Sequence, residues 1–144
     1  MITESNKKIL RFSSLLLFIP GIYSFYYGLN KHGVIACTNS ICSFNYWNYP
    51  NAFNLMLDLI VSKFTFTYFF ITGIRTIDSF SSCNKTNSEM IRAIPLTLSM
   101  IYNYNTSCDM FFCNNNCWIY YHVIFHISGT IAQINCINAI RKKI

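Results

Sequence analysis

The sequence predicts an all-α fold, a polytopic bundle of about five transmembrane helices, from its low charge, its apolar content and its apolar runs. Charged residues make up 11% of the chain, against about 25% in an ordinary soluble domain. Hydrophobic residues make up 53% and aromatic residues 17%, which excludes an intrinsically disordered chain. A soluble protein of 144 residues needs more polar surface than 11 Lys and Arg with 5 Asp and Glu supply. We therefore interpret residues 1–144 as one integral-membrane domain.

Three segments approach or exceed the length of about 20 mostly apolar residues that a spanning helix needs. They are residues 9–29, 52–74 and 118–140. The first has a basic start like that of a signal peptide. It lacks a clear small-residue cleavage site and ends in aromatic residues, so we expect it to be retained as a span. Pro20 and Gly21 in its middle predict a kink.

Two weaker segments complete the five predicted spans. Residues 33–47 are short and carry several polar side chains, and residues 90–104 contain Pro95 and have Arg92 near their start. Short polar helices are tolerated in a membrane when neighbouring helices bury them. We therefore expect these two segments to lie among the three stronger ones.

The distribution of Lys and Arg favours an orientation with the N-terminus outside and the C-terminus inside. In this topology the basic residues on the inner side are Lys31, Arg75, Lys85, Arg92, Arg141, Lys142 and Lys143, and those on the outer side are Lys7, Lys8 and Arg11.

Membrane lipid is the expected partner. No basic face with interleaved aromatic residues on a soluble scaffold is present, so we expect no nucleic-acid binding.

Polar residues recur at helical spacing in three of the predicted spans. Such residues are costly inside a lipid-spanning helix unless they face the interior of the bundle, and this makes them candidate site residues. Three helices that each have one polar face predict a bundle closed around a shared polar centre. The three stripes are Asn39, Ser40, Ser43 and Trp47; Asp58, Ser62, Thr65 and Thr72; and His122, His126, Thr130 and Gln133.

His122 and His126 lie four residues apart, the spacing at which two imidazoles on one helical turn can bind one metal ion. Asp58 is a candidate third zinc ligand, or a general base that orients a bound water. In the alternative interpretation the two imidazoles only hydrogen-bond across helices, or lie at headgroup level beside Trp118. The cysteines form no CxxC pair, which argues against a zinc ribbon.

The order of Ser43, Asp58 and the His122-x-x-x-His126 pair resembles the membrane hydrolase superfamily of the alkaline ceramidases and the adiponectin and progestin receptors. In that superfamily His residues bind zinc, and a Ser and an Asp assist amide hydrolysis. The resemblance implies catalytic roles for Ser43 and Asp58. It also implies that His122, His126 and Asp58 ligate zinc, with a lipid amide as substrate. It covers roughly residues 41–62 and 121–131.

Two features depart from that superfamily. Trp47 stands where a zinc-binding His is expected, and its indole N–H offers no lone pair to a metal. The chain also has room for about five spans, fewer than the superfamily has. We favour a multi-pass membrane protein with a polar Ser/Asp/His centre that lacks a full catalytic zinc site. A zinc-dependent lipid amidase and a small structural or channel-like membrane protein are the alternatives.

Overall fold

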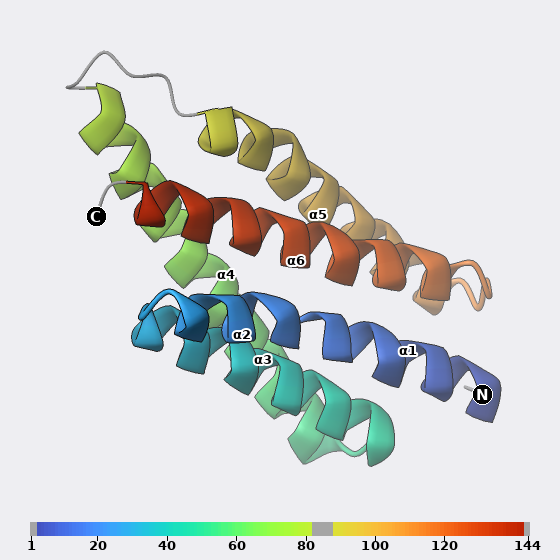
Figure 1. Ribbon diagram of the computed structural model, residues 1–144. Helices are drawn as coiled ribbons and strands as arrows, with labels where there is room; N and C mark the ends of the chain where they lie inside the picture. Colours follow the sequence, from blue (N-terminus) through green and yellow to red (C-terminus); the bar gives the residue numbers. More distant parts are fainter. Residues whose placement is uncertain (1–2, 82–87, 143–144) are drawn as a thin grey trace.

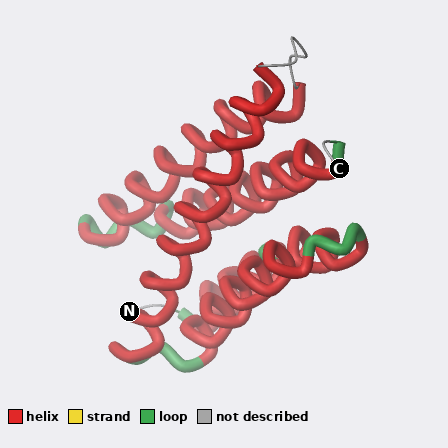
Figure 2. Tube along the Cα trace, turned by 90° about the vertical axis from the view of Figure 1, so that its left-hand side faces the viewer, coloured by secondary structure: helices red, strands yellow, loops and turns green. Residues whose placement is uncertain are grey.

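The computed structural model describes residues 3–81 and 88–142, with the side chains of 77–81 and 88–91 excepted, as a bundle of α-helices (Figures 1 and 2). The described residues contain no strand, which confirms the predicted all-α class. The helices are α1 (Glu4–Leu16), α2 (Phe18–Tyr26), α3 (Asn30–Asn48), α4 (Ala52–Ser81), α5 (Ser88–Phe112) and α6 (Trp118–Arg141).

Helices α1 and α2 form one rod that is interrupted at Leu17. The predicted kink therefore lies one turn before Pro20 rather than at it. The ring of Pro20 lacks the N–H that would bond the carbonyl of Leu16, and it crowds that carbonyl. The backbone N–H of Leu17 instead donates to the carbonyl of Ser14 at 3.2 Å, a tighter turn than the α-helix makes.

The helices run between two ends of the bundle. One end holds the N-terminus, the turn from α3 to α4 and the turn from α5 to α6 (Figure 1). The other end holds the turn from α2 to α3, the last turns of α4, the start of α5 and the C-terminus (Figures 1 and 2). Helix α3 packs on α1, α2 and α4, while α6 packs on α1, α2, α4 and α5. The two central helices are therefore α3 and α6.

Three helical stretches in the described residues are long and apolar enough to cross a membrane. They are Glu4–Tyr26, Ala52–Thr76 and Trp118–Arg141, which correspond to the three strong segments. The prediction of about five spans is thus higher than the count that hydropathy and helix length support. Helices α3 and α5 do form, but their Asn, Ser and Thr residues lower their hydropathy.

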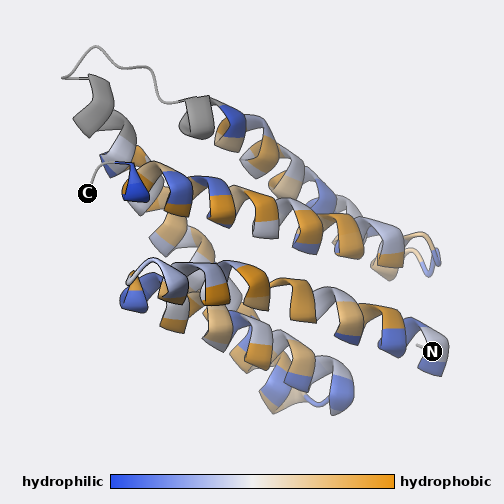
Figure 3. Ribbon diagram, viewed as in Figure 1, coloured by the Kyte–Doolittle hydropathy of each residue, from blue (hydrophilic) through white to orange (hydrophobic). Residues whose placement is uncertain are grey.

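The described bundle buries many polar side chains beside two small apolar clusters, and it exposes many large apolar side chains. Ser14 is 0% exposed and His126 is 2% exposed, whereas Phe12, Ile22 and Leu98 are 76%, 64% and 63% exposed. Apolar residues follow the length of every helix, and many of the most hydrophilic residues lie near helix ends (Figure 3). Large apolar side chains on the outside and polar ones inside are what a lipid surrounding favours.

Helix α5 extends beyond the predicted segment 90–104 and ends at Phe112, although several of the added residues are polar. Two side-chain bonds are made from this helix. The amide of Asn103 donates to the carbonyl of Ser99 at 2.7 Å, and the hydroxyl of Ser107 donates to the carbonyl of Trp118 on α6 at 3.1 Å.

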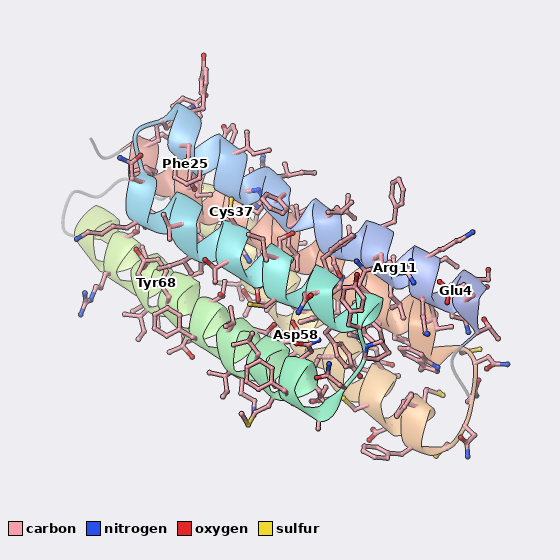
Figure 4. All side chains as sticks on the ribbon, turned by 90° about the horizontal axis from the view of Figure 1, so that it is seen from below. Glu4, Arg11, Phe25, Cys37, Asp58 and Tyr68 are labelled. Atoms are coloured by element: carbon pink, nitrogen blue, oxygen red, sulfur yellow. The ribbon has the colours of Figure 1, made fainter. Side chains whose placement is uncertain are left out.

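The contact between α2 and α3 depends on Gly21. A Cβ at this position would meet the thiol of Cys37, and would lie 3.2 Å from both the Cys37 nitrogen and the Gly33 carbonyl oxygen. A Cβ at Gly33 on α3 would meet the ring of Phe25 on α2. Phe25 and Cys37 lie on facing sides of the two helices (Figure 4). Small residues allow such close approach between helices in a membrane.

We expect Gly21→Ala to destabilise the protein by about 1–3 kcal/mol, because neither α3 backbone atom can move away without moving the helix. Gly129→Ala is the matched control, since its Cβ would meet only the flexible end of Met100 at 3.0 Å. Thermal unfolding in detergent measures both. Equal losses for the two variants would contradict a close α2–α3 contact at Gly21.

Candidate functional site

Buried and half-buried polar groups of four helices form neighbouring hydrogen-bonded clusters that we together call the polar seam. It consists of Ser13 and Ser14 on α1, Asn39, Ser40 and Ser43 on α3, Asp58 and Ser62 on α4, and His126 on α6.

The seam joins α1 to α6 through Ser13 and His126. The hydroxyl of Ser13 lies 2.9 Å from Nδ1 of His126, and both residues are buried. The same hydroxyl donates to the carbonyl of Leu10 at 3.0 Å. Because a hydroxyl has a single proton, we assign the Nδ1–H tautomer to His126, which then donates to Ser13.

The seam joins α1 to α3 through three buried serines. The hydroxyls of Ser14 and Ser43 lie 3.0 Å apart, and the hydroxyl of Ser40 donates to the carbonyl of Ser14 at 2.7 Å. Ser14 itself donates to the carbonyl of Leu10 at 2.8 Å. The carbonyl of Leu10 therefore accepts from both Ser13 and Ser14, and links the His126 branch of the seam to the Ser43 branch.

The seam joins α3 to α4 around Asp58, which lies on the side of α4 next to α3 (Figure 4). The hydroxyl of Ser62 donates to the amide oxygen of Asn39 at 2.9 Å and lies 3.4 Å from the Asp58 carboxyl group. Ser43 lies near the Asp58 carboxyl group. The single proton of Ser43 can point to Asp58 or to Ser14, but not to both.

Two tryptophans and His122 adjoin the His126 branch of the seam. The rings of His122 and His126 lie 4.7 Å apart between centroids, and the ring of Trp47 lies edge-on to His122 at 5.3 Å. Trp118 lies 6.2 Å from His122. The Nε1 atom of Trp47 and the Nε2 atom of His122 are buried without a hydrogen-bond partner among the described residues.

Arg11 positions Trp47. Its Nε donates to the carbonyl of Trp47 at 3.4 Å, and one of its terminal nitrogens lies 2.6 Å from the carboxylate of Glu4. The carbonyl of Trp47 is in the last turn of α3, where helix carbonyls lack intrahelical partners and a positive charge is favourable. Arg11 and Glu4 lie together at the N-terminal end (Figure 4). Arg11 thus ties α1 to α3 as well as lying near the predicted membrane edge.

The structure brings the predicted site residues together in two pairs. Ser43 lies near Asp58, and the ring of His122 contacts that of His126. Among the described residues no hydrogen bond or ion pair joins Asp58 to either imidazole, and no three His, Cys, Asp or Glu side chains form a group that could hold a metal ion. The zinc site stays a prediction. Serines 13 and 14 connect the two pairs.

Sequence reasoning missed Ser13 and Ser14. Their signal is present, because two adjacent serines lie in the apolar run of the first span, where polar residues bond between helices. Lys63 lies deep in the predicted segment 52–74, where the sequence favours pairing with Asp58 or an interior position. Lys63 is instead exposed, and no ion pair between the two is found in the described part of the chain.

No family model, curated protein or solved structure matches this chain. The resemblance to the ceramidase superfamily stays a prediction carried by the motif residues. The fold and the site define a coarser class, a helical bundle with helices able to span a membrane and a polar interior.

Trp47 occupies the space beside His122 that a third imidazole would fill. We expect Trp47→His to raise zinc affinity, because the new imidazole would join two rings that are already adjacent. Zinc bound per purified chain and the rise in thermal stability on adding zinc measure this. Trp47→Phe controls for the loss of the indole. Zinc affinity unchanged from wild type would show that position 47 cannot complete a site.

Proposed function

We propose that this protein is a multi-pass integral membrane protein whose Ser/Asp/His seam fixes how its helices pack, without a full catalytic zinc site. The observation that carries the proposal is the burial pattern, with polar side chains bonded to one another across helices inside and many large apolar ones outside. Such a protein acts through its folded shape and its contacts in the membrane rather than through chemistry at the seam.

The energetics of a lipid surrounding favour this role. Buried polar groups without partners are costly where no water can reach them. Hydrogen bonds between membrane helices contribute about 0.6–2 kcal/mol each, so several of them select one packing arrangement over its neighbours. The bonds that do this here are Ser13 with His126, Ser14 with Ser43, Ser40 with the Ser14 carbonyl, and Ser62 with Asn39.

The structure also contains an apolar groove. It has a volume of about 270 Å³, lies between α3 and α4, and is lined by Val34, Ile35, Thr38, Ile60, Val61, Phe64 and Thr65. None of these residues is in the seam, and their exposed surface is almost wholly apolar. The groove therefore suits hydrocarbon better than the polar atoms of an amide undergoing hydrolysis.

We further propose that the N-terminus faces outside and the C-terminus faces inside. The basic residues concentrate at the end of the bundle that holds the C-terminus (Figure 1). The side of a membrane protein with more Lys and Arg in its short loops faces the cytoplasm.

Replacing seam serines should destabilise the protein, while replacing an exposed serine of the same helix should not. Ser13→Ala leaves the buried Nδ1 of His126 without its partner, at a cost of about 1–3 kcal/mol. Ser5→Ala is the matched control, because Ser5 is exposed on α1. Unfolding in detergent measures both. A Ser13→Ala variant as stable as Ser5→Ala would contradict a packing role for the seam.

Metal analysis of the wild-type protein separates this proposal from the lipid amidase that the resemblance implies. We expect no stoichiometric zinc after purification in detergent with zinc supplied, since the described residues offer two adjacent imidazoles and no third ligand. Mass spectrometry of the metal content gives the measurement. About one zinc per chain would favour the amidase.

A reporter fused after Ile144 should lie in the cytosol, and one fused before Met1 should lie outside, because of the asymmetry of basic residues. Protease protection of the two fusions in sealed vesicles gives the readout. A protected C-terminal reporter with an exposed N-terminal one, in vesicles of cytosolic-side-out orientation, would reverse the assigned orientation.

A further inference from the structure

The basic side chains of the N-terminal end of the bundle make contacts within the protein. At the N-terminal end the carboxylate of Glu4 lies 3.6 Å from Nζ of Lys7 and 2.6 Å from Arg11. Arg11 also donates to the carbonyl of Trp47. The charge at this end is therefore partly neutralised within the protein, and Arg11 is occupied in holding two helices together.

Basic residues from four helices gather at the opposite end, where the α2–α3 turn, the last turns of α4, the start of α5 and the C-terminus lie (Figures 1 and 2). All of the described ones are exposed. We call this surface the basic end, and it consists of Lys31 on α3, Arg75 on α4, Arg92 on α5, Arg141 on α6 and Lys142 beyond it.

Four further charged residues neighbour the basic end in the sequence, and the structure does not describe their side chains. They are Lys85 and Lys143, with two positive charges, and Asp78 and Glu89, with two negative ones. The neighbouring sequence therefore adds no net charge to the five described basic residues. At the other end three basic residues lie with Glu4 and Asp109.

Aromatic residues at the same end mark the level of a membrane interface. Tyr26 is 80% exposed at the end of α2, and the guanidinium of Arg141 lies over the ring of Tyr27 at 4.6 Å. Tyrosines are enriched at the headgroup level of membranes. Arg141 thus lies beside residues of the type that occurs at the depth of lipid headgroups.

We infer that the basic end is a binding surface for the headgroups of anionic phospholipids. Its charge is complementary to a leaflet rich in such lipids, and basic residues close to that surface are each attracted by about 1 kcal/mol. The inference rests on the proposed membrane location. It adds the anionic phospholipid as a specific partner, beyond the apolar contacts with lipid tails that the proposed location supplies.

The test uses the full chain in detergent micelles, titrated with a short-chain phosphatidylglycerol and, separately, with the matching phosphatidylcholine. Binding is followed by tryptophan fluorescence or calorimetry. The wild-type protein should bind phosphatidylglycerol more tightly, and added salt should weaken that binding because it screens exposed charges.

The diagnostic variant is Lys31→Gln with Arg92→Gln. Both residues are exposed and neither makes a described hydrogen bond, ion pair or ring contact, so the fold should survive. Removing two charges should weaken phosphatidylglycerol binding by about 25-fold, about fivefold for each. Lys7→Gln with Lys8→Gln removes two charges from the other end and should leave the affinity within about twofold of wild type, as those charges lie beyond a Debye length.

Equal affinity for the two lipids, or equal losses in the two double variants, would overturn the inference. Displacement of the lipid by inorganic phosphate or by RNA at matched charge would overturn the assignment to a lipid headgroup. Failure of the chain to enter lipid vesicles at all would instead contradict the proposed membrane location. The two proposals therefore fail by different observations.

Discussion

The structure depends on one constraint, that a polar group buried between helices is costly unless it finds a partner within the protein. The bond between His126 and Ser13 meets it most directly, because it joins the first and last helices and satisfies a buried imidazole. Once these two helices are joined, the carbonyl of Leu10 and the hydroxyl of Ser14 carry the same network to α3. The polar interior and the helix order thus follow from one requirement.

The central place of α6 is a consequence of the same requirement. This helix bonds α1 through His126, α2 through Asn138, which accepts from Tyr23 at 2.6 Å, and α5 through Ser128, whose hydroxyl lies 3.3 Å from that of Ser99. Cys136 makes a further contact with the backbone of α4. Polar residues therefore occur around much of α6, because other helices surround it. The predicted stripe from His122 to Gln133 is only one of its buried faces.

The adjacency of Trp47 to His122 has two physical effects. The indole supplies apolar contact area beside two imidazoles, which stabilises their burial. It also places an N–H donor where a metal ligand would need a free lone pair. The packing and the chemistry of this part of the bundle are therefore determined by the same residue, and Arg11 fixes the turn of α3 from which it projects.

The sequence by itself determined the helical class, the three strongest membrane segments and the asymmetry of basic residues, because these follow from composition and from apolar runs along one helix. It also identified which residues share a face, such as Asn39 with Ser43 and His122 with His126. Only the tertiary structure decided which faces meet. The helical period fixes neither the rotation nor the axial position of one helix on another. Here the close approach at Gly21 and the bonds of Ser13 and Ser14 set the rotation and the axial position of the helices. Helix α1, which contributes no residue to either pair, thereby lies between the Ser43–Asp58 pair and the His122–His126 pair.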